Sequence, residues 1–211
     1  MPSPRRVDYP GAIHHVAVNG NNRQELFLND SDRRYCIALL EDTAVRYGWD
    51  VWSYCQMDTH WHMVLRTPTR TLSLGMQRLN NCYSRTFNRH HSRSGHSIRH
   101  RFMSVPVEGE AHLKELTRYL PLNPVRGGLV RHPEAWRWSS YREELGVVEA
   151  PSWLHSEWSL RQHGGSPERL RAWVSAGMAE PGVQWTPGSD PTATPPRRPE
   201  GCTAPRPQAS A

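Results

Sequence analysis

Two histidines separated by one residue, His60 and His62, are the side chains of this sequence most clearly suited to chemistry. They lie in the segment MDTHWHMVL (57–65), where an apolar run follows them. Residues two apart in a strand point to the same face of a sheet, so both imidazoles would project together. Neutral imidazole is a common ligand of divalent cations. The pair therefore predicts a metal site, although a solvated histidine pair or one at the edge of the core would show the same pattern.

A second polar pair, Tyr119 and Asn123, falls at the end of the last amphipathic segment of the predicted domain. Four residues make about one helical turn, so the phenol and the carboxamide can share a helix face. Tyr119 lies on the flank of the stripe formed by Leu113, Leu116 and Leu120, where a substrate can reach it. Ordinary packing is the alternative for such a tyrosine. Tyr83, by contrast, falls within the apolar stripe of its own helix and is predicted to be a core residue.

The elements that must position these side chains alternate along the chain. Strands are predicted at 12–19, 49–57, 61–68 and 98–107, and helices at 32–47, 72–88 and 109–120. This order predicts an α+β fold, with a ferredoxin-like βαββαβ antiparallel sheet and an added C-terminal helix that carries the tyrosine. Asp30 and Ser31 are the predicted caps of the first helix, and Gly48 is its predicted end.

Two prolines follow the tyrosine. Proline removes a helical hydrogen bond and restricts the residue before it. Pro121 and Pro124 therefore predict a bend directly after Tyr119 that turns Asn123 away from the histidines. Along the whole chain, three parts are predicted: a domain over 1–145, a helical extension over 146–185, and a Pro-rich disordered tail over 186–211.

The charge of the chain favours a polyanionic partner. The formal net charge is +6, and Lys114 is the one lysine among 26 basic residues. Arginine suits bidentate contact with phosphate, although a GC-rich genome would also produce this bias. A solvated basic face is the alternative to a nucleic-acid groove. The candidate DNA-binding residues are Arg23, Arg78, Arg85, Arg89, Arg93 and Arg101.

The cysteines and the N-terminus bear on the cellular compartment. The four cysteines form no CxxC pair and are predicted to be reduced thiols. The N-terminus lacks the apolar core of a secretory signal, and no apolar stretch approaches the roughly 20 residues of a membrane span. We therefore expect a cytoplasmic protein associated with the nucleoid, without a membrane partner.

Several segments together carry a resemblance to a known family. They are HHVAVNGNNRQELF (14–27), HWH (60–62), MQRLNNCYSRTFNRHHSRSGH (76–96), RFMSVPVE (101–108) and RYLPLNPVRGGLVRHPEAWRWSSY (118–141). Through them most of residues 5–142 resembles the REP-associated tyrosine transposases, a branch of the single-tyrosine HUH nucleases that act on single-stranded DNA.

The resemblance implies a metal-dependent transposase and endonuclease. Such an enzyme cleaves and rejoins single-stranded DNA beside REP-like hairpins through a 5′-phosphotyrosine intermediate. By resemblance Tyr119 is the nucleophile, while His60, His62 and Asn123 hold Mg²⁺ or Mn²⁺. The family's fold is the ferredoxin-like sheet already predicted. A monomer and a homodimer both stay open.

One departure from the family's pattern precedes the first histidine. Asp58-Thr59 stands where the family usually has Pro-Asn, so the Asp58 carboxylate is a further group that could approach the cation. Together with the bend expected at Pro121, this departure supports a second hypothesis, a domesticated and catalytically impaired protein that binds hairpin DNA. A metallohydrolase that uses the same histidines on a small substrate is a third hypothesis.

Overall fold

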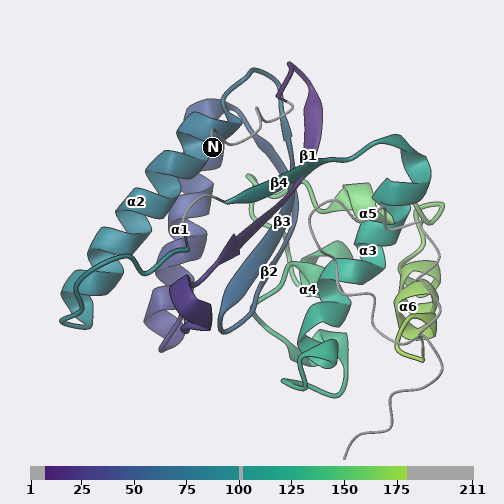
Figure 1. Cartoon of the computed structure of the whole chain (residues 1–211). Helices are drawn as coiled ribbons and strands as arrows, with labels where there is room; N and C mark the ends of the chain where they lie inside the picture. The colour runs from purple at the N-terminus through teal and green to yellow at the C-terminus, as the bar shows by residue number, and fades with distance from the viewer. Residues whose placement is uncertain (1–7, 100–101, 180–211) are drawn as a thin grey trace, which may run out of the picture.

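A four-stranded antiparallel sheet separates two layers of helices in the computed structural model, which describes residues 8–99 and 102–179 (Figure 1). Two predicted features, Arg101 and the tail at 186–211, lie outside these residues. The longer elements are β1 (Ala12–Asn19), α1 (Asp30–Tyr47), β2 (Asp50–Gln56), β3 (His60–Thr67), α2 (Leu72–His90), β4 (Met103–Pro106) and α3 (Gly109–Arg126). The shorter ones are η1 (Asn21–Arg23), η2 (Pro133–Ala135), α4 (Tyr141–Glu144), α5 (Glu157–Arg161) and α6 (Pro167–Ala176).

The strand order is β2-β3-β1-β4, and every neighbouring pair is antiparallel. This is the predicted ferredoxin-like sheet, so the fold class is confirmed. The strand predicted at 98–107 is shorter than expected, because β4 covers only Met103–Pro106 and pairs with β1 as far as Ala17. Ile98 instead forms an isolated bridge with Gly20, beyond the end of β1. Among the described residues, no helix is both long and apolar enough to cross a membrane.

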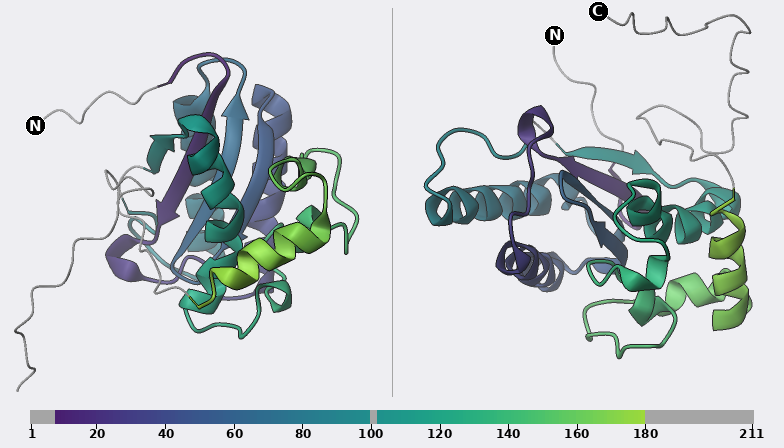
Figure 2. Two further views of the ribbon diagram at one scale, coloured as in Figure 1. Left: turned by 90° about the vertical axis from the view of Figure 1, so that its right-hand side faces the viewer. Right: turned by 90° about the horizontal axis from the view of Figure 1, so that it is seen from below.

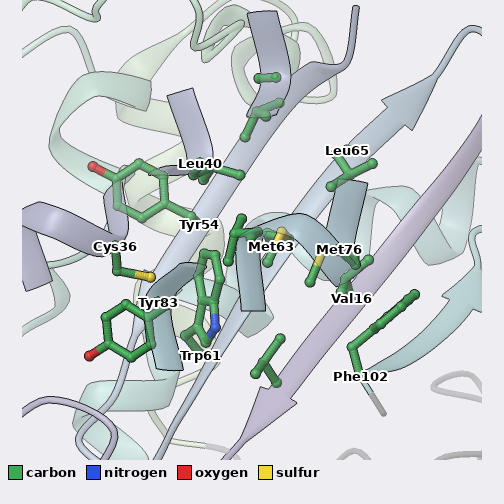
Figure 3. Close-up of a cluster of buried hydrophobic side chains, with 14 of the residues drawn as sticks. Val16, Cys36, Leu40, Tyr54, Trp61, Met63, Leu65, Met76, Tyr83 and Phe102 are labelled. Atoms are coloured by element: carbon green, nitrogen blue, oxygen red, sulfur yellow. The ribbon is translucent and has the colours of Figure 1, made fainter. Parts of the chain in front are cut away.

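The two faces of the sheet pack into two different hydrophobic clusters. Val16, Trp61 and Met63 point toward α1 and α2 and join the larger core cluster, which Figure 3 shows. Tyr83 belongs to this cluster, only 2% exposed, and its hydroxyl donates to the carbonyl of Leu26, so its predicted core position is confirmed. The opposite face is covered by α3, with α6 beside it (Figure 2, left). All the candidate catalytic residues lie on this second face.

The first helix begins earlier than predicted. Its cap is Asn29, whose side chain accepts a hydrogen bond of 3.0 Å from the backbone N–H of Asp32. The predicted caps, Asp30 and Ser31, therefore lie inside the first turn, where an acidic residue is favoured by the helix dipole. Gly48 ends the helix as predicted, in a left-handed conformation with φ of 64° that glycine adopts without strain.

The helix that carries the tyrosine extends through both prolines. α3 continues to Arg126, so the predicted end at Leu120 is wrong, and the prolines do not break the helix between Tyr119 and Asn123. Packing explains the difference, since Leu120 and Leu122 are almost completely buried against two separate clusters, and both prolines are buried as well. Tertiary contacts of this kind override local propensity. Tyr119 and Asn123 therefore lie one turn apart on an unbroken helix.

Gly75 of α2 gives a prediction on stability. A Cβ placed at this position would lie 2.2 Å from Cζ2 of the Trp49 ring. Alanine usually stabilises a helix by about 1 kcal/mol relative to glycine, but forced overpacking costs roughly 1–3 kcal/mol. We expect Gly75→Ala to lower the free energy of unfolding by up to about 2 kcal/mol in urea titrations. The control Ser73→Ala, at an exposed position of the same helix, should leave it unchanged or slightly higher. A stabilised Gly75→Ala would contradict the clash.

A buried carboxylate joins the C-terminal segment to the edge of the sheet. Glu144 of α4 accepts hydrogen bonds of 2.6–2.7 Å from the hydroxyls of Ser53, Ser140 and Ser159. The Ser140 hydroxyl also accepts from the backbone N–H of Tyr54 in β2. Burial raises the pKa of Glu144 to about 7, against the lowering effect of the three hydroxyls.

This raised pKa predicts a dependence of stability on pH. Between pH 4.5 and about 7 the folded chain keeps a proton on Glu144 that the unfolded chain releases, so its contribution to stability falls as the pH rises through that window. The slope approaches about 1.4 kcal/mol per pH unit. We expect Glu144→Gln to remove this component, measured as the difference between urea titrations of variant and parent across the window. Glu157→Gln, at an exposed ion pair, should leave the slope unchanged.

Candidate functional site

Three histidines and the candidate nucleophile gather where α3 crosses the central strands. His60 and His62 of β3 point to the α3 face, as their spacing predicted, with ring centroids 5.1 Å apart. His15 of β1 joins them from the neighbouring strand. The Tyr119 ring lies 5.5 Å from the rings of His15 and His62, edge-on to both. Tyr119 is half-buried, so the protein packs the ring without closing it off from a substrate.

Hydrogen bonds occupy the same ring nitrogen of both predicted ligands. His60 Nδ1 lies 3.2 Å from the Thr59 hydroxyl, and His62 Nδ1 lies 3.1 Å from His15 Nε2. No hydrogen bond within the described part of the chain engages Nε2 of either His60 or His62. Both Nε2 atoms are thus available to an exogenous ligand.

The electrostatic surroundings keep the rings neutral. Burial, followed by the nearby His15 and His60, holds the pKa of His62 well below 6.5. Burial also lowers the pKa of His60, although the Asp58 carboxylate opposes this shift. The pKa of His15 falls to about 3, mainly through burial. Neutral imidazole is the form that coordinates metal ions, and these rings hold it at physiological pH.

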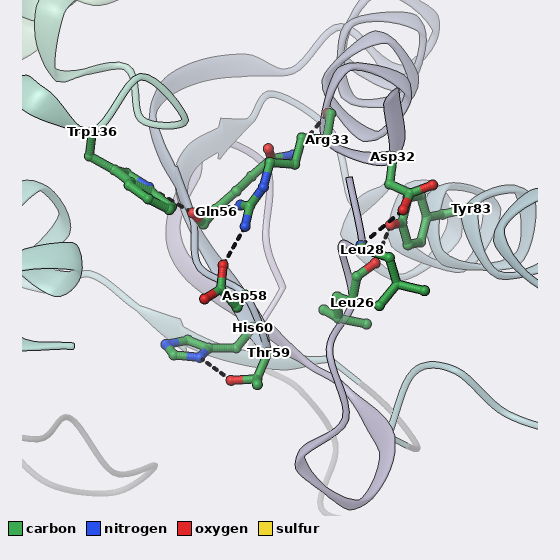
Figure 4. Close-up of polar contacts among 10 residues, drawn as sticks. All are labelled: Leu26, Leu28, Asp32, Arg33, Gln56, Asp58, Thr59, His60, Tyr83 and Trp136. Carbon is green, nitrogen blue, oxygen red and sulfur yellow. Dashed lines mark hydrogen bonds and ion pairs between the residues drawn. The ribbon is translucent and has the colours of Figure 1, made fainter. Parts of the chain in front are cut away.

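The turn that leads into His60 is held by a buried arginine (Figure 4). The Arg33 guanidinium of α1 donates to the Asp58 carboxylate at 2.5 Å and to the Gln56 carbonyl at 3.3 Å. The side chain of Gln56 donates back to the Arg33 carbonyl, and the Trp136 indole N–H donates to the Gln56 carbonyl. The suggestion that Asp58 approaches a cation therefore finds no support in the geometry, because its carboxylate is engaged by Arg33.

Asn123 lies between two positions of α3 that approach β3 and the turn before it. Tyr119, one turn earlier, is opposite His62, and Gly127, one turn later, is so close to Met57 that a Cβ would lie 2.9 Å from its terminal methyl carbon. Met57 is in turn hydrogen-bonded through its N–H to the carbonyl of His60. The Asn123 amide nitrogen donates to the Tyr119 carbonyl at 2.7 Å, which leaves the amide oxygen as an acceptor.

These residues fit a divalent cation with mixed nitrogen and oxygen ligands. Within residues 8–99 and 102–179, no group of three or more His, Cys, Asp or Glu side chains is arranged to hold a metal ion. A cation here would therefore take the two Nε2 atoms of His60 and His62 and depend on an amide oxygen, such as that of Asn123, or on substrate and water for the rest. Imidazole nitrogens together with amide and phosphate oxygens suit Mg²⁺, Mn²⁺ and several transition metals.

Three of the six candidate DNA-binding arginines lie away from this site. Arg78, Arg85 and Arg89 belong to α2, which covers the opposite face of the sheet (Figure 1). Arg78 is also paired with Asp42 at 2.5 Å. Their proposed contact with DNA stays a prediction, but the fold does not bring these three together with Tyr119.

Arg23 and Arg93 lie nearer the histidine end of the sheet. Arg23 is exposed in the loop after β1 and has a left-handed φ of 59°. That loop is hydrogen-bonded to the turn before His60, through the Gly20 N–H and the Thr59 carbonyl. Arg93 donates to the Gln24 side chain of the same loop at 2.7 Å.

Sequence reasoning missed two residues of the site, His15 and Arg33. The pattern AIHHVAVN contains a signal for His15, because alternate residues of β1 share a face, but both faces of β1 are buried and the pattern does not say which face meets the tyrosine. Arg33 lies in a polar stretch of α1 that is typical of a solvated helix face, and nothing local indicates its burial.

Comparisons with known proteins identify the fold and the family of the chain. The structure is similar to that of a REP-associated tyrosine transposase bound to a REP hairpin, with a TM-score of 0.60 and 17% identity over 72% of this chain and 89% of that one. Similarity to a tRNA(His) guanylyltransferase from Saccharomyces cerevisiae is weak, with a TM-score of 0.41 and 12% identity over 85% of each chain. No curated protein matches the sequence. The family described as "Transposase IS200 like" matches residues 9–122, more than half of the chain. The chain is therefore a member of the IS200-like transposase family.

Proposed function

We propose that this transposase cleaves and rejoins single-stranded DNA beside hairpin elements, with Tyr119 as the nucleophile. His60, His62 and Asn123 hold Mg²⁺ or Mn²⁺ in this proposal. The observation that carries it is the approach of the Tyr119 ring to within 5.5 Å of His62, on a helix that stays continuous to Asn123. The hairpin-bound state of the structurally similar transposase supports the substrate class.

The reaction follows from the chemistry of the phenol. A free phenol, with a pKa of about 10, is mostly protonated at neutral pH, and the phosphodiester anion repels nucleophiles. A divalent cation bound by these residues would polarise a non-bridging phosphate oxygen and lower both barriers. The Tyr119 oxygen loses its proton and bonds to phosphorus, while the bond from phosphorus to the 3′ oxygen breaks. That oxygen takes up a proton and leaves as a 3′-hydroxyl.

The covalent intermediate explains strand transfer without an energy source. The 5′-phosphotyrosine ester conserves the energy of the broken phosphodiester bond. The 3′-hydroxyl of another strand end can attack it, restore a phosphodiester and release the Tyr119 phenol. The ring already packs edge-on against both His15 and His62, so little reorganisation of the side chain is needed between the two steps.

A denaturing gel tests whether the protein becomes attached to the 5′ end of the cleaved DNA and releases the 3′-hydroxyl fragment. Hairpin-bearing single-stranded oligonucleotides are labelled at either the 3′ or the 5′ end and incubated with the protein and Mn²⁺ or EDTA. With Mn²⁺ we expect the 3′ label to move with the protein as a slow band and the 5′ label to appear in a short free fragment. Reversed labels would contradict the proposed 5′ linkage. Hairpin binding without an adduct would instead support the catalytically impaired DNA-binding protein.

A further inference from the structure

We propose that His15 is a positioning residue for the cation site, which fixes the His62 ring by accepting a hydrogen bond from His62 Nδ1–H. The purpose of this contact rests on the function proposed above, but the contact itself can be tested without DNA. His15 is not part of the predicted ligand set, and it comes from a different strand.

The geometry of the contact limits what each ring can do. His15 is fully buried, and its Nε2 lies 3.1 Å from Nδ1 of His62. Two neutral imidazoles share one hydrogen in such a contact, so one nitrogen donates and the other accepts. When His62 binds a cation through Nε2, its ring proton must reside on Nδ1. His15 Nε2 is then the acceptor, and this arrangement fixes both the tautomer and the orientation of the ligand.

The sheet holds His15 in place for this role. Ala17 of β1 is directly opposite His62, so His15 is its diagonal neighbour on the same face. Tyr119 packs edge-on against both rings, which restricts their rotation from the side of α3. One side chain therefore supports a ligand and contacts the nucleophile at the same time.

The adjacent histidine provides a matched control. His14 is equally buried, but it points to the other face of the sheet, where its Nδ1 lies 3.3 Å from the Ser104 hydroxyl. A change at His14 thus disturbs the same strand to a similar degree without touching His62. Glutamine at position 15 offers a carbonyl oxygen as acceptor, whereas leucine of similar size offers none.

Manganese binding to the whole chain, followed by electron paramagnetic resonance of free Mn²⁺, tests the role. We expect His15→Leu to weaken Mn²⁺ binding by about 10- to 100-fold, the usual effect of losing an outer hydrogen bond to a ligand. His15→Gln should restore most of the affinity, and His14→Leu should leave it unchanged. Equal affinity in His15→Leu and the parent would overturn the proposal, as would a parent chain that does not bind Mn²⁺.

The tautomer itself can be read by nuclear magnetic resonance, even if the leucine variant does not fold. Two-bond ¹⁵N–¹H spectra of the Mg²⁺-loaded parent should show the His62 proton on Nδ1, with the signal assigned through its loss in His62→Gln. A proton on Nε2 of His62 would overturn the inference whether or not the protein cleaves DNA. Conversely, the expected tautomer together with an absent DNA adduct would leave this inference standing and reject the proposed function.

Discussion

Tyr119→Phe is expected to abolish covalent attachment to DNA while hairpin binding and the fold stay intact. The substitution removes a single oxygen, the atom proposed to attack phosphorus, and keeps the ring that packs against His15 and His62. The variant keeps the packing of the ring but lacks the oxygen proposed to form the ester, so cleavage should fall by at least about a thousandfold. Denaturing gels measure the adduct, and fluorescence anisotropy of a labelled hairpin measures binding.

Tyr83→Phe is the matched control for this result. It also removes one phenolic oxygen, but from the core on the other face of the sheet, where the hydroxyl donates to the Leu26 carbonyl. Tyr83→Phe should lower the free energy of unfolding by about 1 kcal/mol, the value of one hydrogen bond, and leave adduct formation unchanged. Adduct formation retained in Tyr119→Phe, or lost in Tyr83→Phe at a temperature where the variant is folded, would reject Tyr119 as the nucleophile.

Arg33→Leu is expected to destabilise the fold by about 2–4 kcal/mol, the largest loss of stability predicted here. The guanidinium is buried, donates to Asp58 and the Gln56 carbonyl, and lies 4.9 Å from the Phe27 ring centroid. Removing one partner from a buried ion pair costs roughly 3–5 kcal/mol, and a desolvated cation–π contact is worth up to about 2 kcal/mol. Asp58 is 39% exposed and can be rehydrated, which reduces the total.

Arg34→Leu is the control for Arg33→Leu, because it removes the same charge from an exposed position. Arg34 is 63% exposed and lies 3.9 Å from Asp30, so Arg34→Leu should change the free energy of unfolding by no more than about 0.5 kcal/mol. Urea titrations compare the two variants. Arg33→Leu should also weaken Mn²⁺ binding, because it releases the turn before His60. Similar stabilities of the two variants would show that the buried arginine does not hold the turn.

Local sequence patterns were sufficient for the sheet and for the pairing of His60 with His62, because both depend on residues close in sequence. The two-residue period of a strand places the histidines on one face, and the alternation of strand and helix specifies the topology. The flank position of Tyr119 and the core position of Tyr83 follow from the helical period in the same way.

Long-range packing decided what the sequence could not predict. The continuation of α3 through Pro121 depends on the burial of Leu120 and Leu122. Helical propensity is a local property and gives no information on this burial. The arginines of α2 lie off its apolar stripe, but the stripe alone does not reveal that α2 covers the face away from Tyr119. Arg33 is similar, since its partner Asp58 is distant in sequence and no local pattern joins them.

The hydrogen bonds that hold the turn before His60 also set the order in which the active site can form. Leu26 donates to the Asp58 carbonyl from one side of the turn, and the Trp138 carbonyl accepts from Gln56 N–H on the other. Protein synthesis delivers the histidine pair well before Trp138, and such distant contacts close late in folding. A nascent or truncated chain that lacks the Trp136–Trp138 segment would therefore carry both histidines next to a turn without these hydrogen bonds. If Tyr119 and the histidines act as proposed, DNA cleavage would then require the completed domain and not only the segment that carries the histidines.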